Sequence, residues 1–390
     1  MSNQPFLFAE FSPVTKSEWL AKIEKDLKGK PLADLQFQLE EDITVEPFYH
    51  PDDFTENYQP VSSGKPNNTW QIAEYIEAQD IKNANTQALE ALNGGANALL
   101  FELRREPSPD ELAHLLAGIQ LEYVSTNFGQ YFPGKNPYVL LERFYNHLKT
   151  NEIDPTKING SIDFDAILDW VDKPFGEMAE AVQFCSLEMP HFRIIEVDAR
   201  RLHSGVERTS SELALTIAKG SEYLAQLSEF NVSPEIANRH MQFAIASSTS
   251  YFVEIAKLRA LKVLWANVLR AYQVPVEMPL IEVHFAPESQ DNNPNTNMIR
   301  AATQALSAVV GGADRVYVLP ANTALGEASS SFTRRIARNV QHLLQLESHT
   351  DKVIDPAAGS FYIEKLTDKL AEQAWAKFQE IEANGGYLQY

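Results

Sequence analysis

Cysteine is nearly absent from this sequence, because Cys185 is the only one in 390 residues. A single thiol excludes a disulfide framework within the chain and fits a reducing compartment. Phe184, Leu187 and Met189 are its neighbours in the sequence, so we expect a packed thiol and not a nucleophile. The sequence also lacks an apolar run long enough to cross a membrane, and its first residues lack the basic and apolar parts of a secretory signal. These absences predict a soluble, cytoplasmic protein.

Basic residues are scarce as well. The chain has 33 lysines and arginines against 53 aspartates and glutamates, which gives a formal net charge of −20. A surface this acidic repels the phosphates of nucleic acids and of anionic membranes, so we expect neither as a partner. The hydrophobic fraction of 44% is high enough for a full core, which excludes general disorder.

The first 68 residues are typical of an arm and a linker ahead of the main domain. Thr15 and Glu18 are spaced as a capping box, which predicts the start of a helix. Residues 34–48 alternate as a strand does, and residues 61–68 are rich in Ser, Gly, Pro and Asn, as linkers are. We therefore expect one arm, residues 1–68, followed by one large domain that continues to residue 390.

One unit recurs through residues 69–390: a short apolar strand, a polar turn and an amphipathic helix. Strands that are apolar on both faces and alternate with helices indicate a parallel sheet covered by helices. Eight such units fit a closed (β/α)8 barrel, the TIM-barrel fold, better than an open doubly wound sheet, which stays the alternative. The strands are predicted at 98–103, 121–126, 157–162, 193–197, 241–246, 280–285, 315–319 and 352–354.

Capping patterns mark the starts of several helices in these units. Ser108 is followed three residues later by Glu111, and Thr209 by Glu212, which is the spacing of a capping box. Asn297 is expected to cap the helix that ends near residue 310.

In a TIM barrel the working face lies at the carboxyl ends of the strands, so candidate site residues are those at each strand's exit. Such polar residues serve more often as helix caps or in loop ion pairs than in chemistry. No metal-ligand set, carboxylate pair or triad is complete among them, and no glycine-rich phosphate loop follows a strand. The strand-exit candidates are Arg104, Arg105, Asn127, Asp163, Asp198, Arg200, Arg201, Ser247, Ser248, His284, Asn322 and Asp355.

Arg200 and Arg201 follow a buried strand directly. Two adjacent guanidinium groups could clamp a phosphate or a carboxylate in bidentate fashion. The nearby acidic residues Glu196 and Asp198 offer an alternative, in which the arginines are neutralised in a local ion-pair cluster. We favour the ion-pair cluster, because no second feature of an anion site accompanies the arginines.

The histidines also have structural alternatives to a role as ligands. His203 stands before a Ser-Gly turn and is expected to be a loop histidine. His284 lies within a predicted strand, where a hydrogen-bonded core histidine is commoner than a ligand. His342 and His349 are seven residues apart on one helix, which does not match the i, i+4 spacing of a helical metal pair.

Four long stretches carry more specific information than composition does. They are YFVEIAKLRALKVLWA (251–266), FTRRIARNVQ running on to QLES (332–348), VIDPAAGSFYIE (353–364) and AW followed by FQEIE (374–382). In residue identity, order and spacing they strongly resemble the methylmalonyl-CoA mutases. The resemblance covers the chain from about residue 70 to residue 390, and the arm resembles that of the family's small subunits.

The resemblance implies a (β/α)8 barrel that, in catalytic members, threads the pantetheine chain of an acyl-CoA through its centre. It also implies adenosylcobalamin, which a separate domain holds over the mouth of the barrel. The cobalamin motif of that domain, Asp-x-His-x-x-Gly, does not occur in these 390 residues. We therefore expect that this chain itself binds no cofactor, and that adenosylcobalamin enters the complex through a catalytic subunit.

The chain departs from the catalytic members at the site residues. Ile72 stands at the position of the tyrosine that lies over the substrate in those members. Ala199 and Arg200 occupy the positions at which the catalytic members carry a tyrosine and a histidine. That histidine donates a hydrogen bond to the thioester carbonyl of the substrate. Glu282 and Phe285 replace an arginine and a serine that face CoA, and the reversed charge at Glu282 is expected to repel CoA by a few kcal/mol.

These departures imply a barrel without catalytic residues of its own. The leading hypothesis is the non-catalytic small (beta) subunit of a heterodimeric methylmalonyl-CoA mutase, whose large subunit interconverts methylmalonyl-CoA and succinyl-CoA. The arm and barrel helices would contact that large subunit, and acyl-CoA binding by this chain is doubtful. If a substrate site persists, Arg200, His203 and His284 are its candidate residues.

Two enzymatic hypotheses stay open beside it. One is a catalytic acyl-CoA mutase barrel of altered specificity that uses a cobalamin domain supplied in trans. The other is an unrelated barrel enzyme, which would need a metal or a carboxylate pair at the mouth, and the sequence indicates neither.

Overall fold

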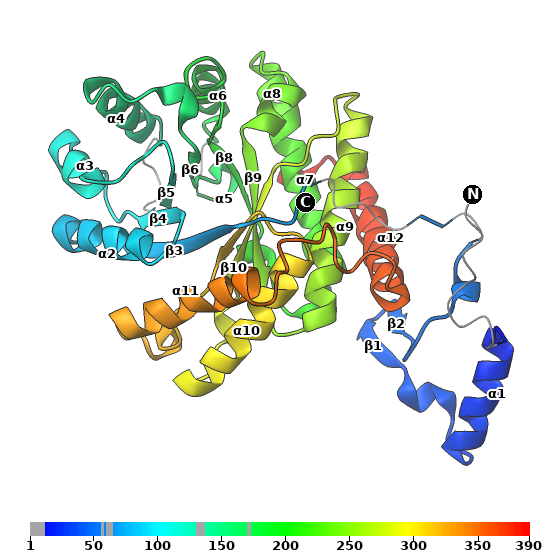
Figure 1. Cartoon of the computed structure of the whole chain (residues 1–390). Helices are drawn as coiled ribbons and strands as arrows, with labels where there is room; N and C mark the ends of the chain where they lie inside the picture. Colours follow the sequence, from blue (N-terminus) through cyan, green and yellow to red (C-terminus); the bar gives the residue numbers. More distant parts are fainter. Residues whose placement is uncertain (1–11, 56–57, 60–64, 130–136, 170–172) are drawn as a thin grey trace, which may run out of the picture.

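The structure is a computed structural model that describes residues 12–55, 58–59, 65–129, 137–169 and 173–390. Its centre is a parallel sheet that curls into a nearly closed barrel, with helices around the outside (Figure 1). The strand segments of this sheet follow the order β7-β6-β5-β4-β3-β11-β10-β9-β8. The predicted (β/α)8 barrel is therefore confirmed.

Each barrel strand except β7, which continues directly into β8, is followed by one or two α-helices, because a chain that pairs parallel strands must cross the sheet to return. The barrel strands are β3 (Gln71–Glu77), β4 (Ala98–Glu102), β5 (Ser125–Gly129), β6 (Gly160–Ile162), β7 (Phe192–Arg193), β8 (Ile195–Asp198), β9 (Met241–Ser247), β10 (Leu280–Phe285) and β11 (Arg315–Tyr317). The helices of the barrel are α2 (Ile81–Asn93), α3 (Pro109–Leu116), α4 (Pro137–Thr150), α5 (Ala166–Asp169), α6 (Phe175–Glu188), α7 (Thr209–Glu229), α8 (Pro234–Arg239), α9 (Tyr251–Ala271), α10 (Pro294–Val310), α11 (Ser331–Leu346) and α12 (Phe361–Ala383).

The barrel closes at β7 and β8, which are two parts of one extended stretch. β7 pairs with β6 and β8 pairs with β9, so the change of neighbour occurs at Ile194. The backbone amides of Ile194 and Ile195 both donate to the carbonyl oxygen of His240, each at 3.1 Å. Beyond the end of β6, the amide of Glu196 donates to the carbonyl of Phe164 at 3.1 Å. These bonds join the two sides of the seam, and the nine segments form eight barrel strands.

The predicted set of strands contains one that does not exist and lacks one that does. Residues 352–354 form a loop, in which Val353 and Ile354 are 56% and 52% exposed. The missing strand is β3, which pairs with β4 and β11. Its glutamates, Glu74 and Glu77, obscured the apolar pattern, whereas the β-branched pair at 353 and 354 imitated it. β5 also begins later than predicted, at Ser125.

The helix starts differ in a similar way. The capping box of Ser108 is present, but α7 begins without a side-chain cap, so the box predicted at Thr209 is wrong. Its glutamate, Glu212, instead binds side chains inside the protein. Asn297 is not a cap either, because Asn293 caps α10, which starts three residues before Asn297.

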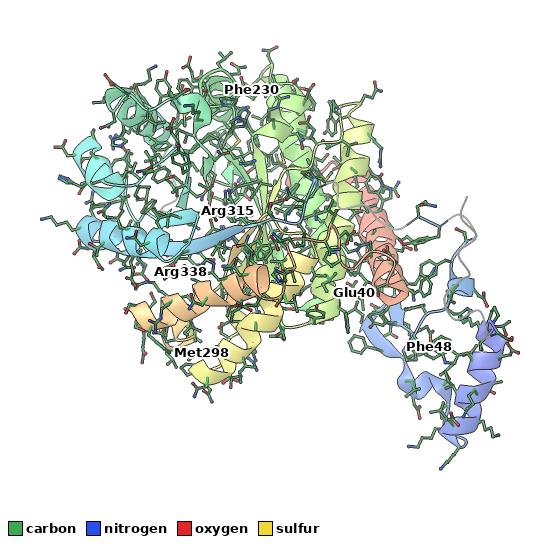
Figure 2. The ribbon with its side chains drawn as sticks, in the orientation of Figure 1. Glu40, Phe48, Phe230, Met298, Arg315 and Arg338 are labelled. Carbon is green, nitrogen blue, oxygen red and sulfur yellow. The ribbon has the colours of Figure 1, made fainter. Side chains whose placement is uncertain are left out.

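The arm lies against one side of the barrel. It consists of α1 (Lys16–Leu27), which has the predicted capping box, and a hairpin of β1 (Phe37–Glu40) and β2 (Ile43–Val45). The hairpin packs beside α12, while α1 projects away from the barrel (Figure 1). Glu40, at the junction in Figure 2, accepts a 2.7 Å hydrogen bond from the amide of Ser210. Lys369 donates to the carbonyl of Thr44 at 2.6 Å, which fixes the other strand of the hairpin.

The apolar core has two parts. A large cluster fills the space between the sheet and its helices, and a small one inside the barrel contains Ala73, Ala98, Leu100 and Tyr317. Cys185 is fully buried in the large cluster, and burial raises the pKa of its thiol to about 12, as expected for a packed thiol. Within the described ranges, no helix combines the length and apolar character needed to span a membrane.

Candidate functional site

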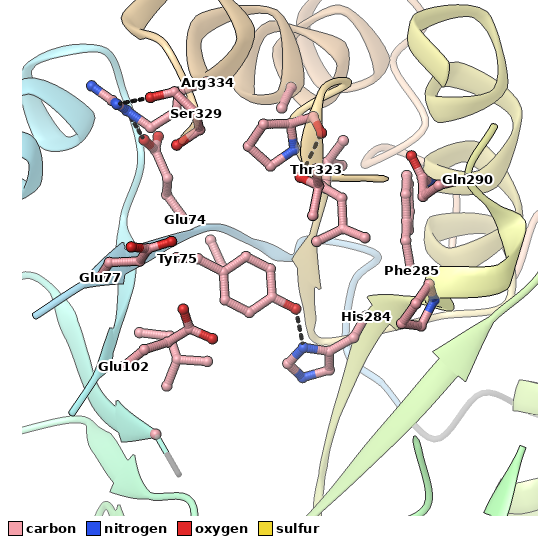
Figure 3. A pocket seen from close by; sticks show the side chains of 18 of the residues that line it. Glu74, Tyr75, Glu77, Glu102, His284, Phe285, Gln290, Thr323, Ser329 and Arg334 are labelled. Carbon is pink, nitrogen blue, oxygen red and sulfur yellow. Dashed lines mark hydrogen bonds and ion pairs between the residues drawn. The ribbon is translucent and has the colours of Figure 1, made fainter. Parts of the chain in front are cut away.

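A cavity of about 850 Å³ opens at the carboxyl ends of the barrel strands. Residues from the ends of β3, β4, β10 and β11, from the turn after β8, and from the segment between β11 and α11 line it (Figure 3). Individual polar side chains from separate parts of the sequence therefore share one space. The predicted candidates that line it are Asp163, Asp198, Arg200, Arg201, His203 and His284.

The other strand-exit candidates do not line this cavity, and several have structural contacts. Arg105 forms an ion pair with Glu111 on the protein surface, and Ser248 donates to Glu254 at 2.6 Å. Asp355 is paired with Arg259 of α9. The candidates that do not line the cavity are Arg104, Arg105, Asn127, Ser247, Ser248, Asn322 and Asp355.

A chain of hydrogen bonds runs from the cavity into the barrel. The Tyr75 hydroxyl lies 2.6 Å from Nδ1 of His284 (Figure 3). Nε2 of His284 lies 2.9 Å from Oε1 of Glu282. The other oxygen of Glu282 accepts a 2.8 Å bond from Arg315. The Tyr317 ring stacks on His284 with centroids 4.4 Å apart and an interplanar angle of 14°. We call Tyr75, Glu282, His284, Arg315 and Tyr317 the axial network.

The charges of the axial network fix its proton positions. Burial lowers the pKa of His284, so this imidazole is neutral near pH 7. Burial opposes ionisation of Glu282, but His284 and Arg315 outweigh it and hold the pKa of Glu282 below its usual range. Because an ionised carboxylate only accepts, the imidazole proton sits on Nε2, and Nδ1 accepts from the Tyr75 hydroxyl. Burial also raises the pKa of Tyr75, which stays protonated.

Three carboxylates gather beside this network, a grouping that the sequence did not indicate. Asp163, Glu196 and Glu282 are all buried, and each offers an oxygen within 4.8 Å of the others. Burial and the neighbouring Glu282 raise the pKa of Asp163 to about 7. The signal for this group was present in the sequence, since each residue is a charged side chain within or at the end of an otherwise apolar strand.

Arg200 is the candidate with the closest charged partners. Its Nε donates to Asp198 at 2.7 Å, and its NH2 group donates to Glu196 at 3.1 Å. The ion-pair cluster that we favoured from the sequence is therefore present. It leaves one terminal nitrogen of Arg200 outside these two pairs, although the side chain lines the cavity.

His203 is more buried than a loop histidine would be. Its side chain is 2% exposed, with Nδ1 2.7 Å from Glu212 and Nε2 3.3 Å from Glu288. The hydrogen bond to Glu212 is the main reason that the pKa of His203 is raised. Lys257 lies 3.1 Å from the other oxygen of Glu212, so His203 belongs to a buried ionic cluster.

Ile72 and Ala199 do not face the cavity. Both are buried in the large cluster between the sheet and the helices. Because side chains alternate along a strand, the neighbours of Ile72 at Ala73 and Tyr75 face the barrel interior instead. Ile72 therefore does not line the cavity, and Ala73 and Tyr75 are the residues that line this part of it.

Glu282 and Phe285 also differ in their placement. Phe285 lines the cavity, whereas Glu282 is fully buried inside the barrel and does not. The charge of Glu282 is matched by Arg315 at 2.8 Å. The expected repulsion between Glu282 and CoA therefore has no basis in this geometry, because the charge is paired and lies away from the cavity surface.

The cavity surface nevertheless has an acidic lining. Eight carboxylates and four arginines line it. Two of the arginines, Arg334 and Arg338, are paired with Glu74, at 3.3 Å and through a short contact respectively. A lining with more carboxylates than guanidinium groups disfavours phosphate-bearing ligands.

Known proteins similar to this chain in sequence agree with the resemblance to the methylmalonyl-CoA mutases. The methylmalonyl-CoA mutase small subunit of Porphyromonas gingivalis is 34% identical over 98% of this chain, and that of Streptomyces virginiae is 30% identical over 98%. The chain spans 65% and 66% of the lengths of these two relatives. Among solved structures, a Plasmodium falciparum HPPK-DHPS chain has a TM-score of 0.40 and 13% identity, with 77% of this chain and 50% of that chain covered, which is too weak to bear on function.

The sequence pattern of the family described as methylmalonyl-CoA mutase matches residues 107–390, which is most of the chain. This match includes every barrel strand from β5 onward and all four stretches on which the resemblance rests. The chain belongs to the methylmalonyl-CoA mutase family.

Proposed function

We propose that this chain is the non-catalytic small subunit of a heterodimeric, cobalamin-dependent methylmalonyl-CoA mutase. In this proposal a large subunit carries the isomerisation of methylmalonyl-CoA and succinyl-CoA, and this chain supports it structurally. The names of the two bacterial relatives support the assignment to a small subunit. The side chains that fill the barrel interior support the absence of catalytic function in this chain.

The observation that carries the proposal is the filled axis of the barrel. Arg315, Glu282 and Tyr317 are fully buried inside it, and His284 is 2% exposed. A pantetheine chain that passed through the barrel would have to displace these side chains and their hydrogen bonds. Eight-stranded barrels are normally filled by side chains, so an open axis would be the exception that catalysis requires.

The histidines at the cavity support the same conclusion for the cofactor. His203 is held between Glu212 and Glu288, and His284 between Tyr75 and Glu282. Both nitrogens of His284 are hydrogen-bonded, and Nε2 of His203, which has no hydrogen bond within the described ranges, is buried 3.3 Å from the Glu288 carboxylate. Neither histidine presents an accessible nitrogen to cobalt, and the described residues around the mouth do not fit a cobalamin. The proposal therefore assigns adenosylcobalamin to the partner subunit.

The arm supports the presence of a partner. None of the residues of α1 is buried, and its apolar side chains Trp19, Leu20, Ile23 and Leu27 are all partly exposed. The only aromatic contacts of Trp19 among the described residues are with Phe48 and His50 of the same arm, the former with ring centroids 3.9 Å apart. An apolar helix face that the described residues cover only in part fits a subunit contact. We propose residues 1–68 as this contact arm and residues 69–390 as the barrel.

The proposal is tested with the purified chain. Adenosylcobalamin and methylmalonyl-CoA are added and succinyl-CoA is measured, and calorimetry with CoA follows. We expect neither turnover nor binding heat from this chain alone. Appreciable turnover, with or without a cobalamin domain supplied in trans, contradicts the proposal and favours the alternative of a catalytic barrel.

The partner contact is tested by co-purification with the large subunit. Ile23→Asp places a charge on the apolar face of α1 and is expected to reduce the amount of co-purified large subunit. Ala21→Asp introduces the same charge at an exposed position of the same helix and is the matched control. Equal co-purification of both variants contradicts the role of this face. In the complex, Arg200→Ala is expected to leave mutase turnover unchanged.

A further inference from the structure

The cavity contains hydrogen-bond acceptors that the protein itself does not use. Asp163 is 3% exposed and lines the cavity. Its Oδ1 accepts from Ser161 at 2.5 Å and from Gln242 at 2.8 Å. Its Oδ2 is buried and has no hydrogen-bond partner in the described part of the chain. A buried carboxylate oxygen without a donor is rare, because leaving it unpaired is costly.

Tyr75 presents a second acceptor. Its hydroxyl proton is directed to Nδ1 of His284, since Nε2 of that histidine carries the imidazole proton toward Glu282. The phenol oxygen therefore has only lone pairs left for a ligand in the cavity. The axial network thus makes the Tyr75 oxygen an acceptor, and not a donor, toward a ligand in the cavity.

Glu77 and Glu102 add two carboxylates at the same cavity. They are opposite each other in the parallel pairing of β3 and β4, and Figure 3 shows both near Tyr75. Within the described ranges neither forms an ion pair, and like charges on directly opposed strand residues repel each other. Partial desolvation at the cavity and the adjacent Glu77 raise the pKa of Glu102, and the charges of Arg200 and Arg104 offset this rise only in part.

Three of the four arginines that line the cavity are paired with carboxylates of the protein. Nε and one terminal nitrogen of Arg200 are held by Asp198 and Glu196, and Arg334 and Arg338 are paired with Glu74. Carboxylates outnumber guanidinium groups by eight to four in the lining, so a ligand with a negative charge would meet net repulsion. A ligand that brings donors and positive charge would satisfy the acceptors that the cavity leaves open.

We propose that this cavity binds a small organic cation, with an ammonium group held by Asp163, Tyr75 and Glu102. The body of the ligand would contact apolar residues of the lining, among which are Leu100 and Phe285. The volume of about 850 Å³ is in the range of small-molecule sites. This inference does not depend on the proposed function, because it concerns binding by the chain itself and not turnover.

A metal ion among the three buried carboxylates is the competing interpretation. Asp163, Glu196 and Glu282 are close enough to share an ion. However, Glu196 is already paired with Arg200 and Glu282 with Arg315, so two guanidinium groups take the place that a metal would need. An ammonium group needs only the unpaired oxygen of Asp163 and the acceptors on the cavity side, and it leaves both pairs intact.

The test compares three probes of equal size on the full chain by calorimetry or ligand-observed NMR. They are 2-phenylethylamine, the neutral 2-phenylethanol and the anionic phenylacetate, and magnesium chloride is the fourth arm. We expect measurable binding of the amine only. Equal or tighter binding of the alcohol or of phenylacetate overturns the proposal, as does the absence of amine binding at millimolar concentration. Magnesium binding without amine binding overturns it in favour of the metal interpretation.

Two variants locate the site. Asp163→Asn and Glu102→Gln are each expected to weaken amine binding about tenfold or more, because each removes a charged acceptor. Glu229→Gln changes an exposed carboxylate at the end of α7 and is the matched control. Glu102 is exposed, so its variant is expected to fold even where the Asp163 variant does not. Amine binding that neither variant changes places the ligand elsewhere and refutes the site.

Discussion

Removal of the Arg315 guanidinium is the most direct test of the filled barrel. Arg315 is fully buried and donates to Glu282, to Gln71 and to Ser125, each at 2.8 Å. Its three partners come from β10, from β3 and from β5, so one side chain links strands on different sides of the barrel. Arg315→Met keeps most of the volume and removes all three hydrogen bonds.

The expected loss follows from the charge that stays behind. Breaking a buried ion pair from one side leaves an uncompensated charge and costs about 3–5 kcal/mol of unfolding free energy. In Arg315→Met, Glu282 keeps only the hydrogen bond from His284. Glu282→Gln is expected to cost less, because glutamine retains an acceptor for His284 and carries no charge. The double variant is expected to lose less than the sum of the two single losses, since the stranded charge is then absent.

Urea unfolding followed by circular dichroism measures these differences, provided that the slopes of the variants agree. Arg335→Met, at an exposed arginine of α11, is the control and is expected to change the unfolding free energy by at most about 0.5 kcal/mol. A loss below about 1 kcal/mol for Arg315→Met, or strict additivity in the double variant, would refute the view that this pair is a structural element of the barrel.

Three further predictions test other parts of the structure. The folded-state pKa of Asp163, at about 7, lies above the unfolded value, so stability falls as pH rises from about 4 to 7. Asp163→Asn should remove up to about 1.4 kcal/mol per pH unit of that slope in urea titrations, and an unchanged slope contradicts the assignment. Gly160→Ala should destabilise by about 1–3 kcal/mol, because the added Cβ would lie 1.9 Å from the carbonyl oxygen of Thr126, whereas Gly176→Ala in α6 meets only ordinary contacts. Cys185 should resist Ellman's reagent in the native state and react after unfolding in urea, and rapid native labelling would show that it is not packed.

The sequence was sufficient for the architecture because the architecture is periodic. A barrel of alternating strands and helices repeats one local pattern, so an error in one unit does not change the fold assignment. The error at residues 352–354 was offset by the missed strand β3, and eight remained the number of units. The capping box at Ser108 was predictable because its glutamate, Glu111, lies at the surface and reaches the backbone while it also pairs with Arg105. The box at Thr209 failed because Glu212 is buried and bonds to side chains within the core.

The site was less predictable because its contacts depend on strand order. Glu282 and Arg315 become neighbours only because β10 pairs with β11 in a register that places them opposite each other. Ser125 lies 190 residues before Arg315 in the sequence, and its hydroxyl oxygen still accepts a hydrogen bond from the same guanidinium group. The local ion pairs of Arg200 span two and four residues, and for that reason the sequence alone indicated them.

The filled axis and the open cavity above it have opposite consequences for ligands. A pantetheine chain would have to break the pair of Arg315 and Glu282, at a cost of about 3–5 kcal/mol, which weakens binding by roughly two to four orders of magnitude. A small molecule in the cavity breaks nothing, because Asp163 Oδ2 has no hydrogen-bond donor among the described residues and the Tyr75 oxygen is left with lone pairs only. The barrel interior that disfavours acyl-CoA therefore also positions the acceptors for a cation. The hydrogen bond to His284 orients the Tyr75 hydroxyl, and the barrel wall buries Asp163. Loss of His284 should thus weaken the cavity site without opening the axis to CoA.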